Sequence, residues 1–161
     1  YRFQAMIWQK TTANTPNLAE LENMKLPKLT PENLPTVRPY LPDTFLQLET
    51  VAGTQTALLL VSEHGGEQYP VAKGATKQGR RRTARIAALI GEAAALRLAA
   101  AYGQQRNIAI PACRKAREVL RNREIRAAYD MAEGSGMTPA ALARRYGLSQ
   151  RAIFNILKRS E

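Results

Sequence analysis

The hydrophobic pattern of the chain is most regular near its C-terminal end, over residues 139–158. Apolar residues there repeat at helical spacing in two short runs, which Gly147 separates. Thr138 and Ser149 come just before the two runs, and both residue types favour the N-cap of a helix. Pro139 suits the first turn of a helix, and Gly147 suits the left-handed conformation that ends one. The pattern predicts two helices joined by a tight turn.

The spacing within this segment is typical of a helix-turn-helix, a motif that places its second helix in the major groove of DNA. The small residue Ala143 lets the two helices cross closely, and apolar side chains fill the angle between them. These side chains are Leu142, Tyr146, Leu148, Ile153, Ile156 and Leu157. The alternative is an ordinary helical hairpin with a solvated basic face. We favour the helix-turn-helix because every position of its pattern is filled.

The second predicted helix has a polar face opposite its apolar stripe. Gln and Asn side chains can pair with adenine in a major groove, and Arg can pair with guanine. The candidates for reading bases are Ser149, Gln150, Arg151 and Asn155. Basic and hydroxyl side chains around them suit contacts with DNA phosphates. The candidates for phosphate contacts are Thr138, Arg144, Arg145, Lys158, Arg159, Arg121 and Arg123.

Two helical stretches are predicted earlier in the chain, over residues 42–64 and 83–102, and a glycine interrupts each. The stretches match each other at a shift of 38 residues, the step from Gly53 to Gly91. Apolar residues before each glycine and the glycine stop after each stretch also align. This indicates an internal duplication in which each copy has a two-part helix, a glycine stop and a short extended run. The alternative is a chance likeness of two alanine- and leucine-rich helices.

The second copy ends in a strand-like run before Pro111, formed by Asn107, Ile108, Ala109 and Ile110. An isolated strand would leave its backbone N–H and C=O groups unpaired. The run must therefore pair with the extended run of the first copy, residues 67–73, or with the same run of a second subunit. The second arrangement would make a two-fold antiparallel ribbon and a homodimer.

Prolines dominate the beginning of the chain, where residues 6–42 hold six of the nine. Each proline removes a backbone donor and disfavours a helix at the residue before it. We therefore predict an extended or disordered arm over residues 6–41, with one short turn near residues 18–24. Residues 1–5 are interpreted as an expression scar and are left out of the argument.

Positive charge follows the arm at two places. Residues 76–85 are predicted to be a basic linker, in which Arg80, Arg81 and Arg82 either touch phosphate or begin a solvated helix. We favour the solvated helix start. A third long helix with a strongly basic surface is predicted over residues 112–131. It would pack on the helix-turn-helix and complete a three-helix domain over residues 112–161.

The net charge of the chain is +11, and all of the excess lies in one half. Residues 80–161 carry seventeen Lys and Arg against six Asp and Glu, whereas residues 1–79 carry seven of each kind. A basic half that contains a helix-turn-helix suggests double-stranded DNA as partner. The alternative is a basic surface that only keeps the protein soluble.

Composition argues against several other classes of protein. No apolar run approaches the ~20 residues of a membrane span, and no signal peptide is visible. The one cysteine, Cys113, is interpreted as a packing residue, and with the one histidine, His64, it forms no metal-binding cluster. No nucleophile or acid–base pair can be assembled, so we expect neither enzymatic activity nor a cofactor. We expect a cytoplasmic protein.

The order of these parts resembles the Mor/C family of transcription activators, first known from Mu-like phages. Four segments carry the resemblance, which covers residues 41–159 and is most specific from Ile108 onward. They are the helix end at Tyr102-Gly103, the strand Asn107 to Pro111, the basic segment Leu120 to Ile125, and Ala141 to Ser149. The proline-rich arm and the duplicated helix depart from the family pattern.

The resemblance implies a mostly α fold, with a helical dimerisation region over residues 42–111, a short β-strand linker and a helix-turn-helix domain. It also implies an intertwined homodimer that uses the strand Asn107 to Ile110. The dimer would bind an imperfect inverted repeat near a phage or prophage promoter and contact host RNA polymerase, in the nucleoid of a bacterial cell. The base-reading residues above, with Arg144 and Arg145, carry over. The alternatives are a DNA-binding repressor or architectural protein, and a phage module that binds a host protein.

Overall fold

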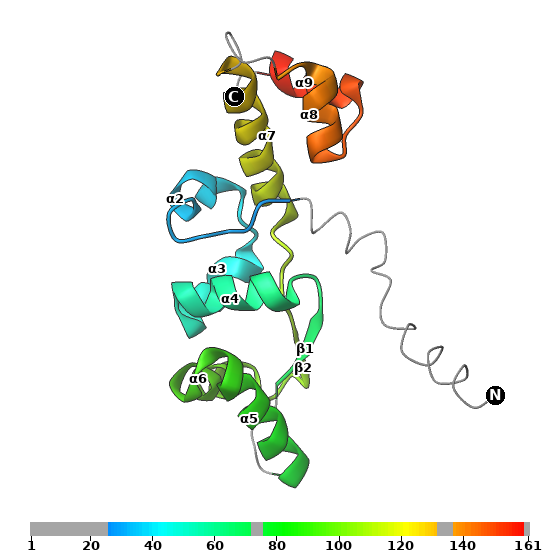
Figure 1. Cartoon of the computed structure of the whole chain (residues 1–161). Coiled ribbons are helices and arrows are strands. Elements are labelled where there is room, and N and C mark those ends of the chain that lie inside the picture. Colours follow the sequence, from blue (N-terminus) through cyan, green and yellow to red (C-terminus); the bar gives the residue numbers. More distant parts are fainter. Residues whose placement is uncertain (1–25, 72–75, 132–136, 160–161) are drawn as a thin grey trace, which may run out of the picture.

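The structure is a computed structural model that describes residues 26–71, 76–131 and 137–159 (Figure 1). It confirms the expectation of a mostly α fold, with one small antiparallel sheet. The elements are α2 (Leu34–Val37), the 3-10 helix η1 (Arg38–Tyr40), α3 (Asp43–Ala52), α4 (Thr54–His64), β1 (Gln68–Pro70), α5 (Lys77–Ile90), α6 (Glu92–Tyr102), β2 (Asn107–Ala109), α7 (Arg114–Asp130), α8 (Pro139–Tyr146) and α9 (Gln150–Lys158). The predicted scar at residues 1–5 and the turn near residues 18–24 lie outside the described residues.

The backbone has the same glycine joint in both copies of the predicted repeat. Gly53 joins α3 to α4 with φ 91° and ψ 160°, and Gly91 joins α5 to α6 with φ 87° and ψ 156°. A side chain would be strained at such positive φ values, so glycine is needed at both joints. A shift of 38 residues carries α4 (Thr54–His64) onto α6 (Glu92–Tyr102) from end to end. The predicted break of each helical stretch at its glycine is therefore confirmed.

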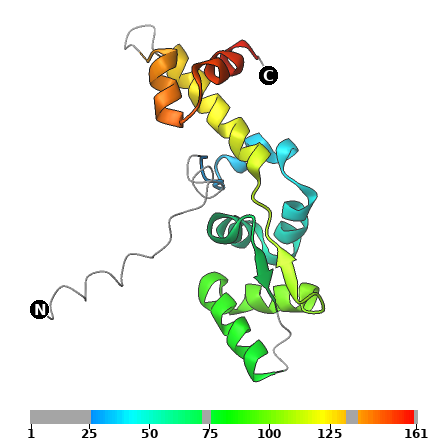
Figure 2. The ribbon, with the colours of Figure 1, turned by 90° about the vertical axis from the view of Figure 1, so that its right-hand side faces the viewer.

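The two strands show the same symmetry. Strand β1 pairs with β2 in antiparallel register, with Tyr69 opposite Ile108 and Pro70 opposite Asn107. The 38-residue shift relates Tyr69 to Asn107 and Pro70 to Ile108. Exchanging the two copies therefore turns the pair Tyr69–Ile108 into the pair Asn107–Pro70, so the ribbon follows the symmetry of the repeat. Helix α3 of one copy packs on α6 of the other. Figure 2 shows the strands side by side between the helices of the two copies. Of the two strand pairings left open by the sequence, the structure has the one within a single chain.

The predicted extended arm is wrong for residues 26–41. Residues 34–40 form α2 and η1, and residues 26–41 as a whole bury Leu29, Leu34, Val37 and Leu41 in the same core as both copies of the repeat. The prolines do not prevent this, because Pro35 and Pro39 stand in the first turns of α2 and η1, where no backbone N–H is needed.

A side chain of α7 also holds the arm in place. The Arg117 guanidinium donates hydrogen bonds to the carbonyl oxygens of Pro27 and Leu26, at 3.0 Å each. These carbonyls belong to an irregular segment without intrahelical partners, and the arginine satisfies them. The arm is thus fixed to the helix that leads to the C-terminal region.

The predicted basic linker is also wrong, because α5 begins at Lys77 rather than near Thr83. The hydroxyl oxygen of Thr76 accepts a hydrogen bond from the Gly79 N–H at 3.0 Å and caps the helix. Gly79 has a low helix propensity, and residues 77–82 contain no apolar residue to show a helical period, which explains the misplaced boundary. The favoured interpretation of Arg80, Arg81 and Arg82, the start of a solvated helix, agrees with their exposed positions in α5.

Candidate nucleic-acid interface

Helices α8 and α9 form the predicted helix, turn and helix. The hydroxyl oxygen of Thr138 accepts a hydrogen bond from the Ala141 N–H at 3.3 Å, and that of Ser149 accepts one from the Ala152 N–H at 3.2 Å. Gly147 has φ 64° and ψ 36°, the left-handed conformation that ends α8. The two caps, Pro139 in the first turn and the glycine end were all predicted from the sequence, and all are confirmed.

A small core holds these two helices against α7. Ile125 of α7, Leu142 and Ala143 of α8, and Ile153 of α9 are buried together. Half-buried apolar side chains surround them, among them Tyr146, Leu148, Ile156 and Leu157. Figure 1 shows α7 extending from the helices of the repeat to α8 and α9, which lie together at one end of the molecule. The orientation of α9 therefore depends on contacts with both other helices.

A hydrogen bond from α7 fixes the end of α9. The Arg126 Nε–H donates to the backbone carbonyl oxygen of Ile156 at 3.1 Å. Sequence reasoning counted Arg126 only as part of a basic surface and missed this role. Its role could have been suspected from its place next to Ile125, because Ile125 packs against residues of α8 and α9.

The predicted base-reading residues lie together on one surface. Gln150, Arg151 and Asn155 are all exposed. Arg151 and Asn155 lie on the side of α9 opposite the fully buried Ile153, and Gln150 lies at the edge of this face, next to α8. Ser149, just before them, is exposed too, and its hydroxyl oxygen is engaged in the cap. Side chains on this face are free to enter a groove, which is the geometry that major-groove recognition needs.

The predicted phosphate-binding residues fall into two groups. Around the helix-turn-helix, five are exposed: Thr138, Arg144, Arg145, Lys158 and Arg159. The Arg145 guanidinium also lies over the ring of Tyr146, at 5.7 Å from its centre. On α7, Arg121 and Arg123 are half-buried, and Arg121 donates hydrogen bonds to the side-chain oxygen of Asn122. The structure thus leaves the first group exposed on or next to the helix-turn-helix, where Arg144 and Gln150 line one pocket, and it leaves Arg121 engaged with its neighbour.

The strand residues predicted to form a dimer contact are not part of this surface. Asn107, Ile108 and Ala109 form β2 in the repeat region, and Ile110 follows with its N–H donating to the carbonyl oxygen of Glu67 at 2.9 Å. Helix α7 separates them from α8 and α9 (Figure 1).

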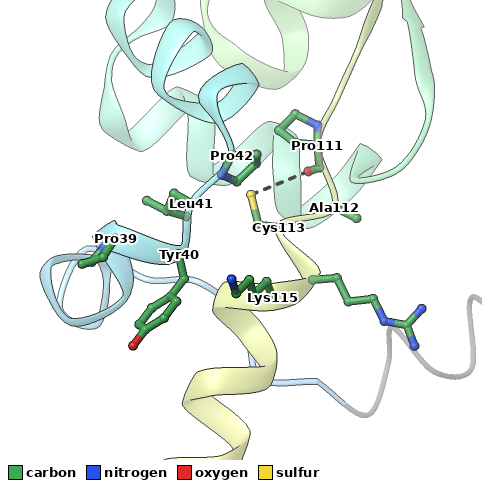
Figure 3. Close-up of a pocket in the computed structure, with 9 residues that line it drawn as sticks. Pro39, Tyr40, Leu41, Pro42, Pro111, Ala112, Cys113 and Lys115 are labelled. Carbon is green, nitrogen blue, oxygen red and sulfur yellow. Dashed lines mark hydrogen bonds between the residues drawn. The ribbon is translucent and has the colours of Figure 1, made fainter. Parts of the chain in front are cut away.

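A pocket lies where the arm meets the start of α7. It is lined by Pro39, Tyr40, Leu41, Pro42, Pro111, Ala112, Cys113, Arg114 and Lys115 (Figure 3). The Lys115 ammonium lies 5.8 Å from the centre of the Tyr40 ring. These lining residues include no histidine or carboxylate, so the pocket offers no general acid–base pair of that kind.

Cys113 is expected to resist alkylation in the folded protein. Its side chain is buried, and burial raises the pKa of the thiol to about 12, so almost no thiolate is present near neutral pH. Iodoacetamide labelling at pH 8, followed by mass spectrometry, should modify the native chain far more slowly than the chain in denaturant. Equal rates would contradict the interpretation of Cys113 as a packing residue.

Within residues 26–71, 76–131 and 137–159, no helix has the length and apolar character to cross a membrane. The same described residues contain no group of three His, Cys, Asp or Glu side chains arranged to hold a metal ion.

An exposed polar face on the second helix of a helix-turn-helix, surrounded by arginine and lysine, defines a DNA-binding protein of the helix-turn-helix class. Residues 67–161 match the family described as the Mor transcription activator family. The match covers more than half of the chain, and the chain belongs to that family. It is therefore a DNA-binding transcriptional regulator of an activator family and not an enzyme. No curated protein sequence and no solved structure matches the chain.

The family match agrees with the resemblance found in the sequence. It begins at Glu67, just before β1, and so includes the whole second copy of the repeat. Helices α3 and α4 of the first copy lie outside it, although the resemblance in the sequence begins at residue 41.

Proposed function

We propose that this protein is a sequence-specific DNA-binding activator of phage or prophage genes and that it recruits host RNA polymerase. The observation that carries the proposal is the exposed face of α9, where Gln150, Arg151 and Asn155 stand together on a helix fixed by a small core. Family membership supplies the activator role. Contacts of this face with base edges would choose the sequence.

Phosphate contacts would supply much of the affinity. Arg144 and Arg145 at the end of α8, with Lys158 and Arg159 at the end of α9, place positive charge on both sides of the base-reading residues. Neutralising phosphates releases counterions, so binding should weaken steeply as salt rises. Phosphate contacts position a protein on the duplex, whereas base contacts select the site.

The number of chains on the DNA is the second part of the proposal. A homodimer would place two recognition helices in major grooves about one turn apart, ~34 Å, on an inverted repeat. Because β1 and β2 already pair within one chain, such a dimer would need another contact surface, such as the outer edges of the ribbon. That intrachain pairing favours a second candidate, in which one chain with one helix-turn-helix is the binding unit.

Sedimentation analysis of the chain, alone and with a selected duplex, separates these two candidates. We expect two chains per duplex if the homodimer is right, with a DNase footprint that spans two half-sites. One chain per duplex and a footprint over one half-site would establish the single-chain candidate. Binding without any sequence preference in a binding-site selection would contradict both.

Two further experiments separate the activator from its rivals. Transcription from a selected site with purified host polymerase should rise when the protein is added, whereas a repressor or purely architectural protein would lower it or leave it unchanged. A mobility shift with genomic DNA tests the remaining rival, a module that binds an acidic host protein. Absence of any shift at low salt would favour that module.

A further inference from the structure

Phe154 lies on the base-reading face of α9 although it is apolar. It is 50% exposed, and it is the only large apolar side chain that is exposed within residues 137–159 of the described structure. It is absent from the buried and half-buried side chains of the small core that holds α9. The packing of the three helices therefore does not explain a phenylalanine at this position.

The helical period places Phe154 among the polar candidates. Successive residues of an α-helix are 100° apart, so positions 150, 151, 154, 155 and 158 share one side, and all five are exposed. The opposite side holds Ile153, which is fully buried, and the half-buried Ile156 and Leu157. Phe154 follows Gln150 by four residues and Arg151 by three, the spacings at which side chains lie next to each other on a helix.

A major groove offers one large apolar feature to such a side chain, the C5-methyl group of thymine. Hydrogen-bonding groups line the rest of the base edges, and they suit the glutamine and arginine next to Phe154. Resting on the proposed DNA-binding function, we propose that Phe154 is a specificity-determining residue that packs on a thymine methyl group, beside the base pairs contacted by Gln150 and Arg151.

Replacement of thymine by deoxyuridine tests this contact directly. Deoxyuridine pairs with adenine in the same way and lacks only the methyl group. The test uses the full chain and a duplex obtained by binding-site selection, in which each thymine is replaced in turn. We expect one position at which the wild-type protein binds about fourfold more weakly, as when one methyl group is no longer buried.

The variants identify the side chain responsible. Phe154→Ala should bind the thymine and deoxyuridine duplexes with equal affinity, whereas Phe154→Leu, which keeps an apolar branch, should retain part of the difference. Gln150→Ala is the matched control from the same face, and it should still distinguish the two duplexes. Alanine is the best helix former, so circular dichroism should show that the Phe154→Ala protein stays folded.

Three results would overturn the proposal. The wild-type protein could ignore deoxyuridine at every position, or Phe154→Ala could keep the full difference. A Phe154→Ala protein that binds DNA normally but no longer activates transcription would assign the ring to a protein partner instead. These results all leave sequence-selective binding intact. Loss of any sequence preference in the wild-type protein would instead contradict the proposed function itself.

Discussion

Leu142→Ala is expected to unfold the helix-turn-helix and abolish sequence-selective DNA binding. Leu142 has no exposed surface, and only Ile125, Ala143 and Ile153 are buried with it. Shortening a buried leucine to alanine costs about 2–5 kcal/mol, through lost burial and the cavity that remains. A core of this size supplies only about 3–5 kcal/mol of net stability. Thermal unfolding followed by circular dichroism, together with binding to a selected duplex, measures both effects.

Leu96→Ala is the matched control for this prediction. It removes the same atoms, but Leu96 of α6 is 59% exposed, so the free energy of unfolding should change by less than about 0.5 kcal/mol. The larger core around Phe45, Leu60 and Leu98 should remain folded in both variants, because Leu142 is not part of it. A Leu142→Ala protein with unchanged unfolding and binding would show that the small core does not hold α9.

Arg151→Ala is expected to relax the choice of sequence at one base pair. Arg151 is exposed in the first turn of α9, where a guanidinium can make two hydrogen bonds to guanine. Loss of such a pair costs about 1–3 kcal/mol of discrimination, roughly fivefold to 150-fold. Competition between the selected duplex and single-base variants measures this change. Arg151→Lys should keep affinity for random DNA but discriminate less, because lysine lacks the rigid planar fork with which a guanidinium holds two acceptors of one base.

Arg145→Ala separates base reading from phosphate binding. Arg145 is exposed in the last turn of α8, beside the base-reading face. Its loss should weaken binding to every duplex alike and lower the salt dependence by about one phosphate contact. An effect limited to the selected site would contradict its role as a phosphate contact. An unchanged sequence preference in the Arg151→Ala protein would contradict the role of Arg151.

The sequence was most informative where structure depends on neighbouring residues. The caps at Thr138 and Ser149, the left-handed Gly147 and the joints at Gly53 and Gly91 all follow from backbone sterics and hydrogen bonds within one turn. The polar face of α9 follows from the helical period alone. These features place the candidate site on α9, which lies within the residues that match the family.

Expectations based on propensity alone were less successful. The arm was predicted to be extended because of its prolines, yet residues 26–41 are docked, since burial of residues such as Leu34 and Val37 outweighs the weak local preference. The basic run before Thr83 was predicted to be a linker, yet it is helical from Lys77, where Thr76 provides a cap.

The sequence by itself determined the helix-turn-helix, its caps and the duplication, because each is written in residue types a few positions apart or in a repeat of them. Tertiary structure alone decided that β1 pairs with β2 inside the chain, that Arg126 reaches the carbonyl oxygen of Ile156, and that Phe154 stays outside the small core. These outcomes depend on contacts between segments far apart along the chain. The free energy of each contact depends on which surfaces come together, and the pattern of neighbouring residue types does not specify that.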